Sequence, residues 1–345
     1  MPMHPQAQLI LDVLGDSGLV INESTDAVAI RAQMEEFATA GQATAEPVDR
    51  VDDRRISGPG GHEIPIRVYR PGDDGPLPVL VWFHGGGWTI GSLDTHDNTC
   101  RSLANGVGCV VVSVDYRLAP EHKFPAAVDD ALAATQWVAD HAAEIGGDPA
   151  RVGVAGDSAG GNLAAVVSLL ARDAGAPELA FQLLVYPVTD YEFESASMLE
   201  NATGCFLELE SMRWFYSQYL NDETDGADWR FSPLRASDLT GLPPAFVLTA
   251  EFDPLRDQGE LYADRLEADG VPVELRRYDG VFHGFFGMRD FMEPAQEAFD
   301  DVTKALRAAL GSSHRPTRAR ALPAPGQPAA CGSGERSERD QESRT

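Results

Sequence analysis

Lysine and cysteine are both scarce in this sequence of 345 residues. Lys123 and Lys304 are its two lysines, and none of its four cysteines belongs to a C-x-x-C pair. That spacing argues against a zinc site and against a disulfide framework, and we expect no metal and no cofactor. Free, scattered thiols are typical of a reducing compartment, so we expect the protein to be cytoplasmic.

Long apolar runs are also missing. No stretch approaches the roughly 18 apolar residues of a membrane-spanning helix, and the first residues do not resemble a signal peptide. Acidic residues outnumber basic ones by 54 to 27, which gives a formal net charge of −27. Such a charge repels nucleic acid and anionic lipid. Coding bias with a solubilising surface and adaptation to salt both account for this acidity.

Short, β-branched runs alternate with helical patterns along most of the chain. This alternation predicts an α/β fold with a mostly parallel sheet. Two further runs, Val48–Ile56 and Glu63–Tyr69, flank a Gly-Pro-Gly-Gly turn and predict an antiparallel hairpin at the sheet edge. The expected strands are Val79–Phe83, Val110–Val114, Arg151–Ala155, Phe181–Tyr186, Ala245–Ala250 and Val273–Tyr278, and the expected helices include Ala126–His141, Asn162–Arg172 and Leu261–Asp269.

Two segments depart from the alternation. Gln8–Gly41 is mostly helical by pattern, and Thr189–Arg230 is inserted after a strand. Within the insertion, Leu209–Leu220 carries apolar residues on one helical face, which fits either core packing or a lid over the sheet. From residue 311 onward the composition predicts disorder. The expected organisation is N-terminal cap helices in 1–45, an α/β core in 46–188 and 231–310, a cap insertion in 189–230 and a disordered tail in 311–345.

One serine is surrounded by small residues in the stretch from Gly153 to Asn162, "GVAGDSAGGN". Gly156 to Gly160 matches G-x-S-x-G directly after a predicted strand and before a predicted helix. In this context the motif forms a sharp turn that exposes the serine hydroxyl. The residues at 156 and 160 must then be small, and Ser158 is the expected nucleophile.

A second glycine-rich motif, "HGGGW", follows an earlier predicted strand at residues 84–88. Consecutive glycines leave backbone N–H groups uncovered, so they can bind a developing oxyanion. No Walker lysine accompanies these glycines, which argues against a phosphate-binding loop.

Asp253 and His283 follow the serine in the order nucleophile, acid, histidine, and each comes just after a predicted strand. His283 is the expected base, and Asp253 is expected to orient its ring. Glu251 and Asp257 are weaker candidates for the acid, because one is expected on the strand and the other in the next helix. The remaining histidines are assigned to chain ends, loops or helix surfaces, except for His84, which is expected to brace the glycine loop.

Taken together, "HGGGW", "DYRLAPEHKFPAA", "GDSAGGN", "DPLRD" and "HGF" resemble the bacterial hormone-sensitive-lipase-like esterases, over essentially residues 1–310. The resemblance implies an α/β-hydrolase fold with a helical cap and an oxyanion hole formed by the N–H groups of Gly85, Gly86 and Ala159. It implies cofactor-free hydrolysis of short- to medium-chain carboxylic esters through an acyl-enzyme. It also suggests a homodimer, and it gives Asp115, Arg117 and Glu121 a scaffold role.

Bulky aromatic residues near the expected site predict a short acyl pocket for a small-molecule ester. Two other functions stay open: hydrolysis of amides or lactones by the same triad, and ligand binding without catalysis, as in the plant gibberellin receptors. Those receptors lack the catalytic histidine, whereas His283 is present here. The expected pocket residues are Trp88, Asp157, Tyr186, Phe206, Leu207, Tyr216 and Phe282.

Overall fold

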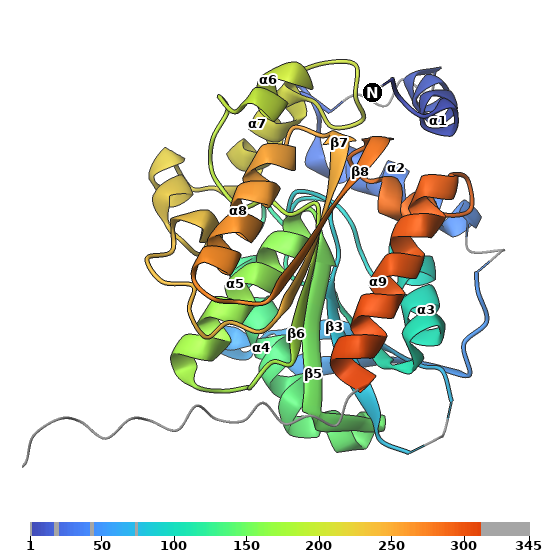
Figure 1. Cartoon of the computed structure of the whole chain (residues 1–345), viewed down its shortest axis with the longest axis vertical. Coiled ribbons are helices and arrows are strands. Elements are labelled where there is room, and N and C mark those ends of the chain that lie inside the picture. Colours follow the sequence, from blue (N-terminus) through green and yellow to red (C-terminus); the bar gives the residue numbers. More distant parts are fainter. Residues whose placement is uncertain (1, 17–20, 42–44, 73–74, 312–345) are drawn as a thin grey trace, which may run out of the picture. The chain divides into compact units, whose positions relative to one another are not determined.

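The strands form one sheet in the places that the short apolar runs predict (Figure 1). The structure is a computed structural model that describes residues 2–16, 21–41, 45–72 and 75–311. The expected tail therefore lies outside the described residues, apart from Gly311. The strands are β1 (Arg50–Ser57), β2 (Glu63–Arg70), β3 (Leu77–Phe83), β4 (Val110–Val114), β5 (Gly147–Asp157), β6 (Phe181–Val185), β7 (Ala245–Phe252) and β8 (Val273–Phe282).

The strand order is β1-β2-β4-β3-β5-β6-β7-β8. Neighbours from β4 to β8 run parallel, whereas β1 and β2 form the predicted antiparallel hairpin at one edge. Phe83 pairs with both Val114 and Gly156, and Phe252 pairs with Phe282. The parallel strands therefore end at a common edge, and the predicted α/β class is confirmed.

Side chains of the central strands alternate between two hydrophobic clusters, as successive residues of a strand must. Val79, Val81 and Phe83 face one cluster, and Leu80 and Trp82 face the other. Helices cover both faces, which is why these strands are almost wholly apolar. The helices of the first face are α4 (Ala126–His141), α5 (Ala159–Ala174) and α8 (Arg256–Ala268), and those of the second are α3 (Asp97–Leu103) and α9 (Glu293–Gly311).

The N-terminal segment and the insertion contribute helices at the end of the sheet towards which β7 and β8 point (Figure 1). Trp214 donates to the Thr25 carbonyl at 3.1 Å, and Ser211 donates to the Ile21 carbonyl at 2.9 Å, so the two segments hold each other. The helices are α1 (Pro5–Asp16), α2 (Ala27–Gly41), α6 (Ala196–Glu200) and α7 (Leu209–Tyr219).

Arg31 on α2 fastens this N-terminal segment to the core. Its guanidinium forms a two-pronged ion pair with Glu121, at 2.8 and 2.7 Å, and also donates to the carbonyls of Thr89 (2.6 Å) and Ala119. The hydrogen bonds from Arg31 are the main reason that the pKa of Glu121 falls to about 2. The scaffold role expected for Glu121 thus has a specific form, a contact between α2 and the chain next to the glycine loop.

We expect Arg31→Met to lower the free energy of unfolding by about 1–2 kcal/mol at neutral pH. A partly exposed ion pair contributes less than about 1 kcal/mol, and two buried carbonyls also lose their donor. Because Glu121 has a lowered pKa, the ion-pair part is present above about pH 4 and is lost as the pH falls towards 2. Urea unfolding at several pH values measures this, with Arg50→Met, which removes an exposed ion pair, as the control. Equal losses in the two variants would contradict the anchoring role.

Candidate active site

Ser158 occupies a strained turn between β5 and α5. Its backbone has φ 56° and ψ −118°, a left-handed conformation that costs a non-glycine residue energy. The turn is held on both sides, because the Ser158 N–H donates to Val185 at 2.9 Å and its carbonyl accepts from Asn162 at 3.0 Å. The hydroxyl is thereby presented at the carboxyl edge of the sheet.

The two glycines of the motif leave the space that this turn needs. A Cβ on Gly156 would lie 2.6 Å from the Phe83 carbonyl oxygen and still closer to the backbone of Gly160. A Cβ on Gly160 would overlap the Phe83 carbonyl even more severely. The prediction that residues 156 and 160 must be small is therefore confirmed, and the obstacle is backbone from β3, which has little freedom to move.

Hydrogen bonds join Ser158, His283 and Asp253 in one line. His283 Nε2 lies 2.9 Å from Ser158 Oγ, and His283 Nδ1 lies 2.7 Å from Asp253 Oδ2. His283 directly follows β8 and packs against the Tyr186 ring, with 4.6 Å between ring centroids. This arrangement lets the carboxylate fix the ring with Nδ1 protonated, so Nε2 is free to accept the serine proton.

The carboxylate of Asp253 is fully buried and has a partner on each oxygen, since the Leu255 N–H donates to Oδ1 at 2.8 Å. Asn201 from the insertion reaches the Asp253 carbonyl at 3.4 Å. The rival acids lie elsewhere: Glu251 is within β7, and Asp257 is in α8, where it accepts from the Ser197 N–H.

The glycine loop lies beside the serine, but its N–H groups are not equivalent. The Gly85 N–H donates to Asp157 Oδ1 at 2.9 Å, so this expected oxyanion donor is already engaged. Gly86 and Gly87 have positive φ values of 112° and 56°. In the described part of the chain, no acceptor is found for either N–H group. The Ala159 N–H lies in the first turn of α5, where backbone donors lack intrahelical acceptors.

Asp157 also contacts a histidine whose expected place is a loop or a helix surface. His96 Nε2 lies 3.2 Å from Asp157 Oδ1. Burial alone would raise the pKa of Asp157, but the charge and hydrogen bond of His96 lower it overall. His84 braces the glycine loop as expected, with Nδ1 2.8 Å from the Gly85 carbonyl, and burial lowers the pKa of His84 to about 3.

The expected pocket residues do not all face one space. Trp88 is fully buried and stacked on Tyr219 of α7, with 4.5 Å between ring centroids, and Tyr216 of the same helix belongs to this aromatic cluster. Phe206 is 37% exposed and its ring lies 6.0 Å from that of Phe282, next to His283. Of the remaining members, Asp157 directly precedes Ser158, Tyr186 packs against the His283 ring, and Leu207 is a buried residue of the insertion itself.

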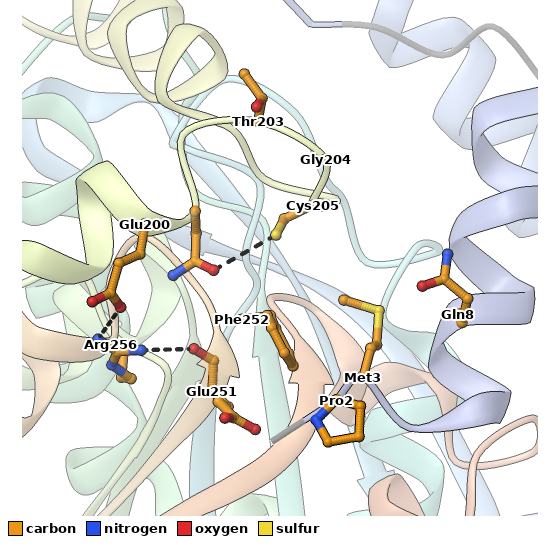
Figure 2. Close-up of a pocket in the computed structure, with 11 residues that line it drawn as sticks. Pro2, Met3, Gln8, Glu200, Thr203, Gly204, Cys205, Glu251, Phe252 and Arg256 are labelled. Carbon is orange, nitrogen blue, oxygen red and sulfur yellow. Dashed lines mark hydrogen bonds and ion pairs between the residues drawn. The ribbon is translucent and has the colours of Figure 1, made fainter.

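A separate cavity of about 510 Å³ lies beside the carboxyl end of β7 (Figure 2). It is bordered by the N-terminal segment and the loop after α6, and it includes neither the triad nor any expected pocket residue. Figure 2 shows Glu200 paired with Arg256. The Cys205 thiol lies 3.7 Å from Asn201 Oδ1. In the described residues, no group of His, Cys, Asp and Glu side chains is arranged to hold a metal ion, and no helix is long and apolar enough to cross a membrane.

The fold and the serine elbow together define a class of protein. Residues 80–287 match a protein family whose members have the α/β-hydrolase fold, and the chain belongs to this family.

Relatives with known names match this chain over most of its length. The chain is 46% identical over 317 residues to the carboxylic ester hydrolase LipN of Mycobacterium tuberculosis, and the match covers 89% of this chain and 83% of the relative. It is 41% identical to an ethyl acetate hydrolase of Pseudomonas putida, over 81% of this chain and 89% of the relative. The solved structure of a hyperthermophilic esterase from Pyrobaculum calidifontis is similar with a TM-score of 0.85 and 45% identity, covering 89% and 99% of the two chains.

We expect Gly160→Ala to prevent stable folding or to lower the unfolding temperature by more than 10 °C. The added methyl group meets the backbone of β3, and neither side can move without breaking the sheet. Circular dichroism during thermal unfolding measures the loss. Gly15→Ala in α1 is the control, since a Cβ there meets no atom within 4 Å. A stable Gly160→Ala protein with wild-type activity would contradict the steric account of the turn.

Proposed function

We propose that the protein is a serine carboxylesterase that hydrolyses short- to medium-chain carboxylic esters. The observation that carries the proposal is the hydrogen-bonded line from Asp253 through His283 to Ser158, which ends at a strained, outward-facing hydroxyl. The names of the relatives, carboxylic ester hydrolase and ethyl acetate hydrolase, support ester substrates.

In the acylation step, Ser158 Oγ attacks the ester carbonyl carbon while His283 Nε2 accepts the hydroxyl proton. The protonated ring then gives this proton to the leaving alkoxide oxygen, and the C–O bond breaks to release the alcohol. Asp253 stabilises the positively charged ring without taking its proton. In the second step a water molecule attacks the acyl-enzyme with the same ring as base, which releases the acid and restores Ser158.

The oxyanion formed in both steps needs donors that are not already engaged. Gly86, Gly87 and Ala159 meet this condition, whereas the Gly85 N–H would have to leave Asp157. We therefore assign the oxyanion hole to the first three, and Gly85 to holding the loop. Preorganised donors of this kind supply a large part of the rate enhancement in acyl transfer.

We infer three further features of the protein. The segments 1–45 and 189–230 act together as the cap, since α7 is hydrogen-bonded to the N-terminal segment. The protein is cytoplasmic, which the buried free thiols of Cys100 and Cys109 favour. It forms a homodimer, which light scattering of the purified protein tests directly.

The triad should act as one unit. We expect Ser158→Ala and His283→Ala each to lower kcat for p-nitrophenyl butyrate by roughly 10⁴-fold or more, and the double variant to be hardly worse, because both residues serve one step. Asp253→Asn should also lower kcat strongly, but by less than either alanine variant. Stopped assays on variants with matched circular dichroism spectra measure this. Negligible wild-type turnover with tight ligand binding would favour a receptor, and full activity in either single variant would refute the assignment.

Phe215 on α7 should limit the length of the acyl chain. Its ring contacts Gly87, where a Cβ would overlap it, so it closes the space beside the glycine loop. We expect Phe215→Ala to raise kcat/KM for octanoate relative to butyrate esters several-fold, because a pocket is only as deep as its lining permits. Phe291→Ala, which removes a 71% exposed ring, is the control. An unchanged ratio in Phe215→Ala would place the acyl chain elsewhere.

A further inference from the structure

The residue next to the nucleophile is a carboxylate in an unfavourable place. Asp157 holds the glycine loop by accepting the Gly85 N–H at 2.9 Å, and only 13% of its side chain is exposed. A Cβ on Gly85 would overlap this carboxylate, so the two groups are in close contact. The same loop must stabilise a developing oxyanion, and an unpaired negative charge in a poorly solvated site opposes another one nearby.

His96 supplies a partner for this charge. Its Nε2 lies 3.2 Å from Asp157 Oδ1, and its side chain is 19% exposed. His96 Nδ1 lies 2.9 Å from Thr95 Oγ1, which is also 3.0 Å from the Ser92 carbonyl. The Thr95 hydroxyl can therefore donate to a neutral His96 ring, or turn towards Ser92 and accept from a doubly protonated one. A doubly protonated His96 ring therefore has an acceptor for each N–H group: Thr95 Oγ1 for Nδ1–H and Asp157 Oδ1 for Nε2–H.

The other basic group at this site cannot take over the task. His84 lies beside His96, with 5.5 Å between ring centroids, but it is fully buried. Burial, together with the repulsion of His96, lowers the pKa of His84 to about 3, so it stays neutral at ordinary pH. Its Nδ1 contacts the Gly85 carbonyl and the Tyr116 hydroxyl instead of a carboxylate.

We propose that His96 is a positioning residue for catalysis, which neutralises Asp157 so that this carboxylate holds the glycine loop without opposing the oxyanion. The inference rests on the proposed esterase function. His96 touches neither the ester nor the triad; it acts through Asp157 and Gly85. It therefore affects the transition state, where the oxyanion carries charge, and leaves binding of the uncharged ester nearly unchanged.

A double-mutant cycle tests this inference. We expect His96→Ala to lower kcat for p-nitrophenyl butyrate on the order of 10- to 100-fold, with KM changed by less than about 3-fold. Asp157→Asn keeps an oxygen that accepts from Gly85 but removes the charge, so His96→Ala in that background should cost no more than about 3-fold. His122→Ala, which removes an exposed histidine, is the matched control.

Two further measurements separate charge from packing. His96→Gln keeps an N–H donor without the positive charge, and we expect it to lose most of what His96→Ala loses. Butylboronic acid forms a negatively charged tetrahedral adduct on a serine nucleophile. Its inhibition constant should rise in His96→Ala by about the factor by which kcat/KM falls.

The outcomes are distinct. An inactive wild type would refute the proposed esterase function itself. An active wild type with equal losses from His96→Ala in both backgrounds, or with full activity in His96→Gln, would overturn the role of charge. If His96→Ala unfolds, His96→Gln replaces it in the cycle: a loss of kcat that appears in the wild type but not in Asp157→Asn supports the role of charge, and equal losses in both overturn it.

Discussion

A lack of space at one turn governs the arrangement of the site. Gly156 and Gly160 approach the end of β3 so closely that no Cβ fits at either position, and Ser158 between them is forced into a left-handed conformation. Strain of this kind persists only where the surrounding structure over-determines the backbone. Here β3, β6 and the start of α5 all hold the turn, and the result is a hydroxyl that points away from the sheet towards His283.

The parallel sheet brings the other groups of the proposed triad to this hydroxyl. Asp253 and His283 each follow the last residue of a strand, and the pairing of Phe252 with Phe282 sets β7 and β8 to end together. The glycine loop after β3 reaches the same edge, because Phe83 pairs with Gly156. Groups far apart in the sequence therefore meet at the carboxyl ends of the strands, where open α/β sheets bind their ligands. The N-terminal segment and the insertion add a second layer, held by Arg31 and α7.

The sequence predicts those parts of the molecule that local pattern determines. Strands buried on both faces, the hairpin, α4 and the strand-turn-helix around Ser158 follow from periodicity and glycine placement. Other features depend on contacts between distant segments. Asp157 and His96 are 61 positions apart, and nothing in either local sequence indicates their ion pair. Likewise, three consecutive glycines do not reveal that the first N–H is already bound to Asp157. Trp88 follows these glycines, yet its ring stacks in the cluster under α7.

The proposed function requires that the strained turn make the Ser158 hydroxyl a reactive nucleophile. Paraoxon, a neutral phosphate triester with a p-nitrophenolate leaving group, phosphorylates such a serine covalently. After reaction, mass spectrometry of the intact protein and of its peptides should show one diethylphosphoryl group per chain, on Ser158, with loss of esterase activity in the same proportion. Esterase activity that survives complete modification of Ser158, or inactivation by modification of a different residue, would contradict the account.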